Sequence, residues 1–159
     1  MELIATVVRV VRDEFADFAD GELVTRTSVR LLLAAILGGL LGFEREAKGK
    51  AAGLRTHMLV TLGAALFVMV LELENAPADA MSRVIQGIVS GIGFLCAGTI
   101  LKSDSGQYIK GLTTSASLWF STAIGITVGL GSQATAVLGT LLALLILHSL
   151  TPFERPERS

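Results

Sequence analysis

Cysteine, histidine and charge are all scarce in this sequence, and each shortage excludes a class of protein. The single cysteine, Cys96, cannot form an internal disulfide, and with two histidines it supplies too few ligands for an ordinary zinc site. Charged residues make up only 17% of the chain, and the formal net charge is -1. Nucleic-acid binding needs a basic face, which this balance does not supply. We therefore expect no nucleic-acid partner and no redox or zinc chemistry.

The sequence also lacks the groupings that nucleophilic enzymes require. Ser90, Ser117 and Cys96 lie in apolar stretches with no histidine or acid at helical spacing, whereas a nucleophile needs a general base beside it. A phosphate-binding loop of the Walker type is absent from the sequence as well. We expect a protein that is not an enzyme and that carries no cofactor.

Apolar residues are what the sequence has in excess. They make up 52% of the chain, the mean hydropathy is +0.66, and residues 31–43 and 58–71 contain no ionisable side chain. A charge at the centre of a bilayer costs roughly 2.5–3.5 kcal/mol, so membranes impose this kind of spacing. The sequence therefore predicts an integral membrane protein whose first partner is the lipid bilayer.

The apolar runs divide the chain into helices that can cross a membrane, each close to the ~20 residues that a crossing needs. The predicted spans are 25–43, 57–73, 84–101, 112–130 and 134–150. We predict an all-α fold, a polytopic transmembrane bundle of about five helices. This domain occupies residues 23–151, and residues 152–159 form a short cytoplasmic tail.

Residues 1–22 are predicted to form an amphipathic segment. The apolar side chains that recur at intervals of three or four residues are Ile4, Val7, Val11, Phe15 and Phe18. They share one helical face, opposite a face of arginines and aspartates. This pattern is typical of a helix that lies in the membrane interface, and a loosely packed tail is the alternative.

Two hairpins of the bundle resemble each other. Residues 53–56 (GLRT) enter the second span after a polar loop, and residues 111–114 (GLTT) enter the fourth span in the same way. Both hairpins run in the same direction, which is typical of transporters with a site between parallel repeats. Either the bundle is a parallel two-hairpin repeat with a fifth helix added, or the similarity of two glycine-rich hairpins is chance.

Basic residues near the ends of the spans predict the orientation, because they favour the cytoplasmic side. One side carries Arg45, Lys48, Lys50, Arg55, Lys102, Lys110, Arg155 and Arg158, and the other carries Arg9, Arg12, Arg26, Arg30 and Arg83. The richer side is predicted to be cytoplasmic. The N-terminus then lies outside and the C-terminus inside.

Glycines recur at GxxxG spacing in three of the predicted spans. These pairs are Gly38 and Gly42, Gly87 and Gly91, and Gly125 and Gly129. Small residues at this spacing allow the backbones of two helices to approach closely. We predict packing within one bundle, and the alternatives are packing between two copies in a homodimer or a narrow ion path.

Polar residues gather at the predicted cytoplasmic face and form the candidate functional cluster. Its members are Glu44, Arg45, Arg55, Thr56, Asp104 and Thr114. The two threonines stand where helices begin, where a hydroxyl can cap free amide groups and the helix ends attract carboxylates. Two or three of the carboxylates could contact Mg²⁺, which takes few protein oxygens. In the alternative reading, the carboxylates pair with nearby bases in solvated loops and contribute little energy.

Several motifs in this order resemble a known family. They are GFERE at 42–46, AGLRTH at 52–57, GAALF at 63–67, IVSGIGFL at 88–95 and GLTTSASLW at 111–119. Together they resemble the MgtC/SapB family of bacterial inner-membrane proteins over residues 31–150. The resemblance implies five spans with an external N-terminus and an internal C-terminus. It also implies a link to growth in low Mg²⁺, to acid stress and to virulence.

The resemblance leaves two functions open. The family name suggests a Mg²⁺ transporter, whereas the best-known member is regarded as a regulator that binds other membrane proteins, ATP synthase among them. This chain departs from the family at Gln86, which stands one residue before the usual position, and at Cys96, where a glycine is usual. It also resembles the short form that lacks a cytoplasmic domain. We expect a modulator of other membrane proteins, with an ion transporter or channel as the alternative.

Overall fold

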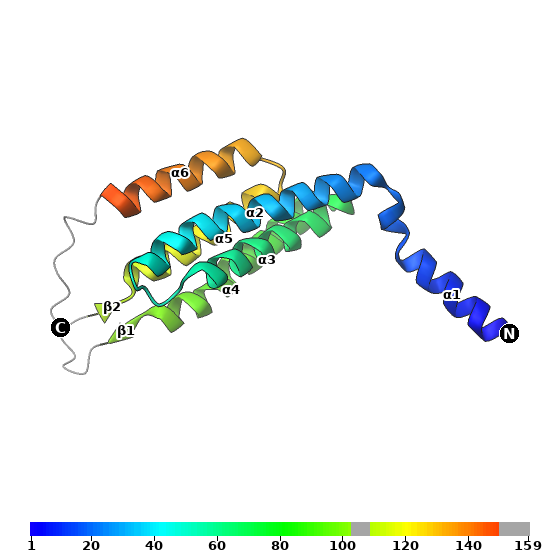
Figure 1. Ribbon diagram of the computed structural model, residues 1–159, viewed down its shortest axis with the longest axis horizontal. Helices are drawn as coiled ribbons and strands as arrows, with labels where there is room; N and C mark the ends of the chain where they lie inside the picture. The colour runs from blue at the N-terminus through cyan, green and yellow to red at the C-terminus, as the bar shows by residue number, and fades with distance from the viewer. Residues whose placement is uncertain (103–108, 150–159) are drawn as a thin grey trace.

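The computed structural model describes residues 1–102 and 109–149, and almost all of these are helical (Figure 1). The helices are α1 (Glu2–Glu14), the short 3₁₀ helix η1 (Ala16–Ala19), α2 (Gly21–Ala47), α3 (Leu54–Leu73), α4 (Ala78–Thr99), α5 (Leu112–Gly129) and α6 (Gln133–Ser149). Two short strands, β1 (Leu101–Lys102) and β2 (Ile109–Lys110), pair antiparallel between α4 and α5. The predicted all-α helical bundle is confirmed.

Among the described residues, α2, α3 and α4 are long and apolar enough to cross a membrane, at 27, 20 and 22 residues. Helix α6 is a shorter apolar helix of 17 residues, and α5 has 18 residues. Each predicted span lies on one of these helices, although α2, α3 and α4 begin several residues earlier than expected. The number of spans stays a prediction.

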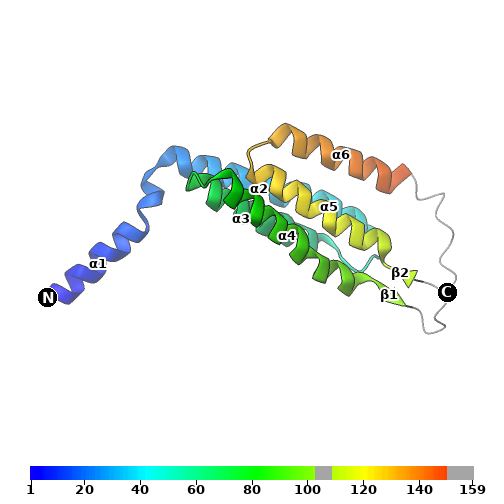
Figure 2. The same ribbon diagram turned by 180° about the vertical axis from the view of Figure 1, so that it is seen from behind.

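Helix α5 occupies the centre of the bundle. It packs against α2, α3, α4 and α6, and most of its side chains are buried or half-buried. Helix α4 covers one side of α5, and α6 lies on the opposite side, against α2 and α5 (Figures 1 and 2). The main apolar core joins α2, α3, α5 and α6, and its buried members are Ala34, Leu37, Ala65, Met69, Ile124, Val128 and Ala136.

The N-terminal segment stands away from the bundle, as Figure 1 shows. Helix α1 has no buried residue, and its apolar face is exposed along its whole length. A new helix starts at α2, where the Asp20 carboxylate accepts hydrogen bonds from the amides of Glu22 (3.0 Å) and Leu23 (3.1 Å). The segment is helical over Glu2–Glu14, and its place in the membrane interface stays a prediction.

Four of the six predicted packing glycines lie at helix contacts within the chain. A Cβ atom added at Gly38 would lie 2.7 Å from the His57 carbonyl oxygen, so α2 rests directly on the backbone of α3. A Cβ atom added at Gly42 would lie 2.8 Å from the Gly53 carbonyl oxygen and 2.7 Å from the Cα atom of Leu54. On the other side of α3, a Cβ at Gly125 would lie 2.8 Å from the Cβ of Ala64, and one at Gly129 would lie 2.8 Å from the Ala65 carbonyl oxygen.

Gly87 and Gly91 do not make such contacts. Nothing in the described structure lies within 4 Å of a Cβ added at either position. Their spacing matches that of the other pairs, but no described helix lies in close contact with them. Close packing of these two glycines inside one bundle is therefore wrong for the described residues, and packing between two copies stays a prediction.

We expect Gly125→Leu to destabilise the bundle by about 1–3 kcal/mol, because the larger side chain must push α5 away from α3. Gly93→Leu on α4 is the matched control, since nothing lies within 4 Å of its Cβ position. Thermal unfolding of both variants in detergent measures the difference. Equal midpoints would show that the α3–α5 contact does not limit stability.

Candidate functional site

The last turn of α2 carries a buried ionic cluster. The Arg45 side chain is 3% exposed, and its Nε donates to Oε2 of Glu44 at 2.7 Å. The ammonium of Lys48 lies 2.6 Å from the other oxygen, Oε1 of Glu44, and also donates to the Leu147 carbonyl of α6 at 2.6 Å. The cluster therefore ties the end of α2 to the end of α6.

This arrangement corrects the prediction that Glu44 and Arg45 lie in a solvated loop. Helix α2 continues to Ala47, so both residues are helical, and Glu44 and Arg45 are almost completely enclosed. The expected pairing of Glu44 with neighbouring bases does occur. Because the pair is largely shielded from water, removing one partner costs more than breaking a surface ion pair would.

Thr56 and Thr114 do not cap their helices, which corrects a second prediction. The residue before α3 is Gly53, and the amide of Leu54 donates instead to the Glu46 carboxylate at 2.8 Å. Helix α5 follows Gly111, whose φ of +91° places it in the left-handed region that favours glycine. Each threonine lies two residues beyond the first residue of its helix, too far along to act as the cap.

A buried imidazole links α3 to α5. His57 is completely buried; its Nδ1 lies 2.9 Å from the Gly53 carbonyl oxygen and its Nε2 lies 3.1 Å from Oγ of Ser117. A carbonyl only accepts, so Nδ1 carries the proton and donates to Gly53. The Ser117 hydroxyl also lies 2.8 Å from the Thr114 carbonyl, so a neutral His57 and this carbonyl compete for one hydroxyl proton.

The structure thus separates the predicted functional residues into two groups. Glu44, Arg45 and Thr114 lie at one end of the bundle, where α2 ends and α5 begins. Arg55 and Thr56 lie at the same end, in the first turn of α3, but their side chains are exposed. Asp104 lies outside the described residues.

The opposite end of the bundle carries a second ionic contact that the sequence reasoning missed. Arg30 is 8% exposed and pairs with the Glu72 carboxylate. Its Nη2 donates to Oε1 of Glu72 at 3.3 Å. Its Nη1 also donates to the Gly129 carbonyl at 3.0 Å, at the end of α5. A guanidinium at a helix C-terminus compensates the partial negative charge of the last carbonyls. The signal was available, since Arg30 and Glu72 are charges inside or beside apolar runs and need a partner in lipid.

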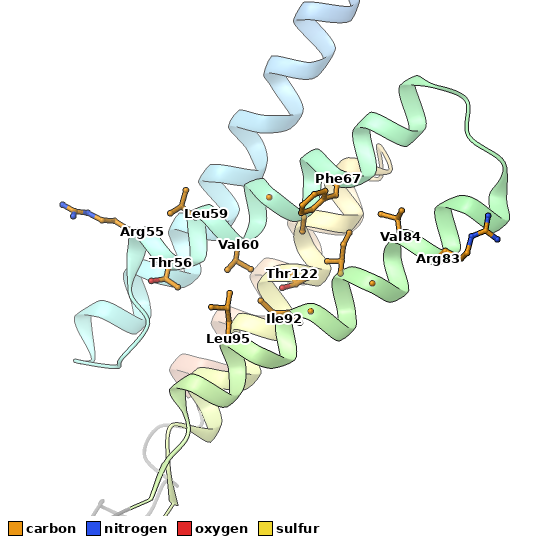
Figure 3. A pocket seen from close by; sticks show the side chains of 15 residues that line it. Arg55, Thr56, Leu59, Val60, Phe67, Arg83, Val84, Ile92, Leu95 and Thr122 are labelled. Carbon is orange, nitrogen blue, oxygen red and sulfur yellow. The ribbon is translucent and has the colours of Figure 1, made fainter.

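Between α3 and α4 lies a groove of about 840 Å³ (Figure 3). Aliphatic side chains and glycines make up most of its wall, with Phe67 on α3 and Thr122 of α5 also contributing. Arg55 stands at one end and Arg83 at the other. Gly87 and Gly91, which lack contacts within the chain, line this groove.

No group of three or more His, Cys, Asp or Glu side chains with the geometry of a metal site occurs in residues 1–102 and 109–149. The carboxylates that lie within the bundle helices are Glu22, Glu44, Glu46, Glu72 and Asp79, and Glu22 and Asp79 pair with Arg26 and Arg83. Each already accepts from a cationic or amide donor.

Comparison with known proteins places the chain near one family. A family model described as the MgtC family matches residues 31–156. "Putative magnesium transporter YhiD" of Escherichia coli (strain K12) is 42% identical over 134 residues, which cover 77% of this chain and 61% of YhiD. Protein SrpB of Synechococcus elongatus is 40% identical over 142 residues, covering 82% of this chain and 76% of SrpB. Protein MgtC of Brucella abortus is 42% identical over 129 residues, covering 81% of this chain and 53% of that protein. No solved structure matches the chain.

We expect Arg30→Gln to lower the free energy of unfolding by about 1–3 kcal/mol, because it leaves the Glu72 carboxylate and the Gly129 carbonyl without their donor. The matched control is Arg26→Gln, which removes an exposed ion pair with Glu22 one turn away and should cost less than about 0.5 kcal/mol. Unfolding in detergent measures both variants. Similar small losses would mean that the Arg30 contact is as weak as a surface pair.

Proposed function

This chain belongs to the MgtC family, and from that premise we propose that it is a multi-pass protein of the bacterial inner membrane that modulates other membrane proteins. The proposed role is non-enzymatic and serves magnesium homeostasis or adaptation to stress. The names of YhiD and MgtC among its relatives support the link to magnesium. The matched region covers about half to three quarters of these relatives, so their complete activities do not transfer with the family.

One observation favours a modulator over a transporter. Glu44 pairs with Arg45 at one end of the bundle, and Glu72 pairs with Arg30 at the other end. Mg²⁺ binds through oxygen ligands, usually one or two carboxylates that carry negative charge. A guanidinium that already neutralises the carboxylate competes with the cation for the same oxygens. The charged groups of the bundle therefore support helix packing better than they support ion passage.

The alternative function is an ion transporter or channel. The name of YhiD supports it, and so do buried polar groups along the interior of α3 and α5, among them His57, Thr61 and Ser121. The Ser121 hydroxyl is fully buried and has no hydrogen-bond partner in the described part of the chain. Polar side chains inside a membrane are the usual elements of an ion path.

Two measurements separate these functions, one on the purified protein and one in cells. In proteoliposomes, a modulator should give no flux of Mg²⁺, H⁺, Na⁺ or K⁺ above that of empty liposomes. After cross-linking in cells, the modulator should be recovered with a specific membrane protein. If any of these ions shows measurable flux, and if that flux falls in Ser121→Val, the proposed function is wrong and the protein is a transporter.

The ionic cluster provides the matched variants for a test in cells. Glu44→Gln should abolish growth in low Mg²⁺ or at acid pH when it replaces the native gene, because Arg45 and Lys48 lose their shared partner. Glu22→Gln removes an exposed carboxylate of the same helix and should leave growth unchanged. Membrane fractionation checks that both variants are inserted. Full growth with Glu44→Gln would show that the cluster holds α2 in place without serving the function.

We also propose that the N-terminus lies outside and the end of α6 faces the cytoplasm, since the side that carries Arg45, Lys48 and Arg55 holds more basic residues. Lys110 and Asp79 are exposed and lie at opposite ends of the bundle, so they report the orientation.

A membrane-impermeant thiol reagent added to intact cells should label Asp79→Cys and spare Lys110→Cys. Both variants are made with Cys96→Ala, which removes a buried thiol that donates to the Ser115 carbonyl oxygen at 3.3 Å. Labelling after cell lysis controls for access to each position. Labelling of position 110 in intact cells would reverse the proposed orientation.

A further inference from the structure

The groove between α3 and α4 has the length of about one leaflet of a membrane. Its residues on α3 run from Arg55 to Phe67, and those on α4 run from Arg83 to Leu95. Twelve residues separate the ends of each row, which is roughly 18 Å of helix. The hydrocarbon core is ~30 Å thick, so the groove covers a little more than half of that thickness.

The two ends of the groove differ in charge. At the far end, Arg83 donates to the Asp79 carboxylate at 2.8 Å and is neutralised on its own helix. At the near end, Arg55 is exposed in the first turn of α3, and within residues 1–102 and 109–149 it has neither an ion pair nor a hydrogen bond. Figure 3 shows its side chain extending beyond the end of the groove. Among the described residues, Arg55 therefore gives this end of the groove a positive charge with no ion-pair partner.

The wall of the groove offers apolar contact and little else. Gly63, Gly87 and Gly91 leave space beside the backbone, since nothing lies within 4 Å of a Cβ at any of them. The floor residue Thr122 donates its hydroxyl to the Leu118 carbonyl at 3.1 Å, so its donor is already satisfied. An apolar chain, and not a polar solute, fits these surroundings.

From this geometry we propose that the groove binds one anionic phospholipid, with the headgroup at Arg55 and the acyl chains along Gly63, Gly87 and Gly91. Charge selects the anionic headgroup, because a basic residue beside the membrane surface attracts anionic lipids. This site does not depend on whether the protein modulates or transports.

Native mass spectrometry of the purified protein, titrated with phosphatidylglycerol or phosphatidylcholine, tests the charge. The wild type should retain one phosphatidylglycerol per chain and bind it about fivefold more tightly than phosphatidylcholine, as expected for one arginine at the membrane surface. Arg55→Gln should lose this preference. Arg83→Gln, at the neutralised end, should keep it. Equal affinity for the two lipids in the wild type would overturn the proposal.

A pair of glycine variants tests the place of the acyl chains. Gly91→Leu fills the groove, whereas Gly93→Leu adds the same side chain on α4 at an equally open position outside the groove. Gly91→Leu should reduce retained lipid at least tenfold, and Gly93→Leu should retain it as the wild type does. Unchanged retention in Gly91→Leu would overturn the site. A wild-type dimer that holds no lipid and becomes a monomer in Gly91→Leu would assign the groove to a second copy instead.

Discussion

Helix α3 can lie against α2 and α5 at the same time because glycines face it from both sides. Lipid tails are as apolar as leucine, so helices in a bilayer gain little from hiding apolar surface and depend on close contact and hydrogen bonds. Gly38 and Gly125 bring neighbouring backbones onto α3 near Thr61. At that distance the polar side chains of α3 find partners on adjacent helices, as His57 does with Ser117. The remaining structure builds on this three-helix contact.

Two cationic side chains of α2 add contacts between this helix and its neighbours. Arg30, which lies nine residues after the first residue of α2, joins this helix to the ends of α3 and α5, and Lys48 joins its last turn to α6. Both cations reach main-chain carbonyls that the helix itself leaves without a donor. Glu72 offsets the charge of Arg30, and Glu44 shares its carboxylate between Lys48 and Arg45. The result is a structure in which arginine and lysine act as connectors between helices.

The sequence predicted the helices well because apolar runs are a local property, and each predicted span lies on an observed helix. It could not predict contacts between residues far apart in the chain, such as Arg30 with Glu72 or His57 with Ser117, because helical spacing relates only neighbours on one helix. The capping role expected of Thr56 was wrong because Glu46, eight residues before Leu54, serves the start of α3. The GxxxG spacing at Gly87 and Gly91 identified a face of small residues, but spacing alone does not say what covers that face.

The central place of α5 also determines the order in which the bundle can assemble. Helices enter the membrane from the N-terminus as the chain is made, so α2 and α3 can pair through Gly38 and Gly42 as soon as both are inserted. Helix α4 cannot settle at that stage, because its buried residues Ile92 and Cys96 pack with Leu118 of α5, which has not yet been synthesised. While the ribosome adds the segment between α4 and α5, α4 must rest in lipid beside an unfinished pair. The bundle is therefore completed late, when α5 arrives and contacts α2, α3 and α4, and α6 is added after it.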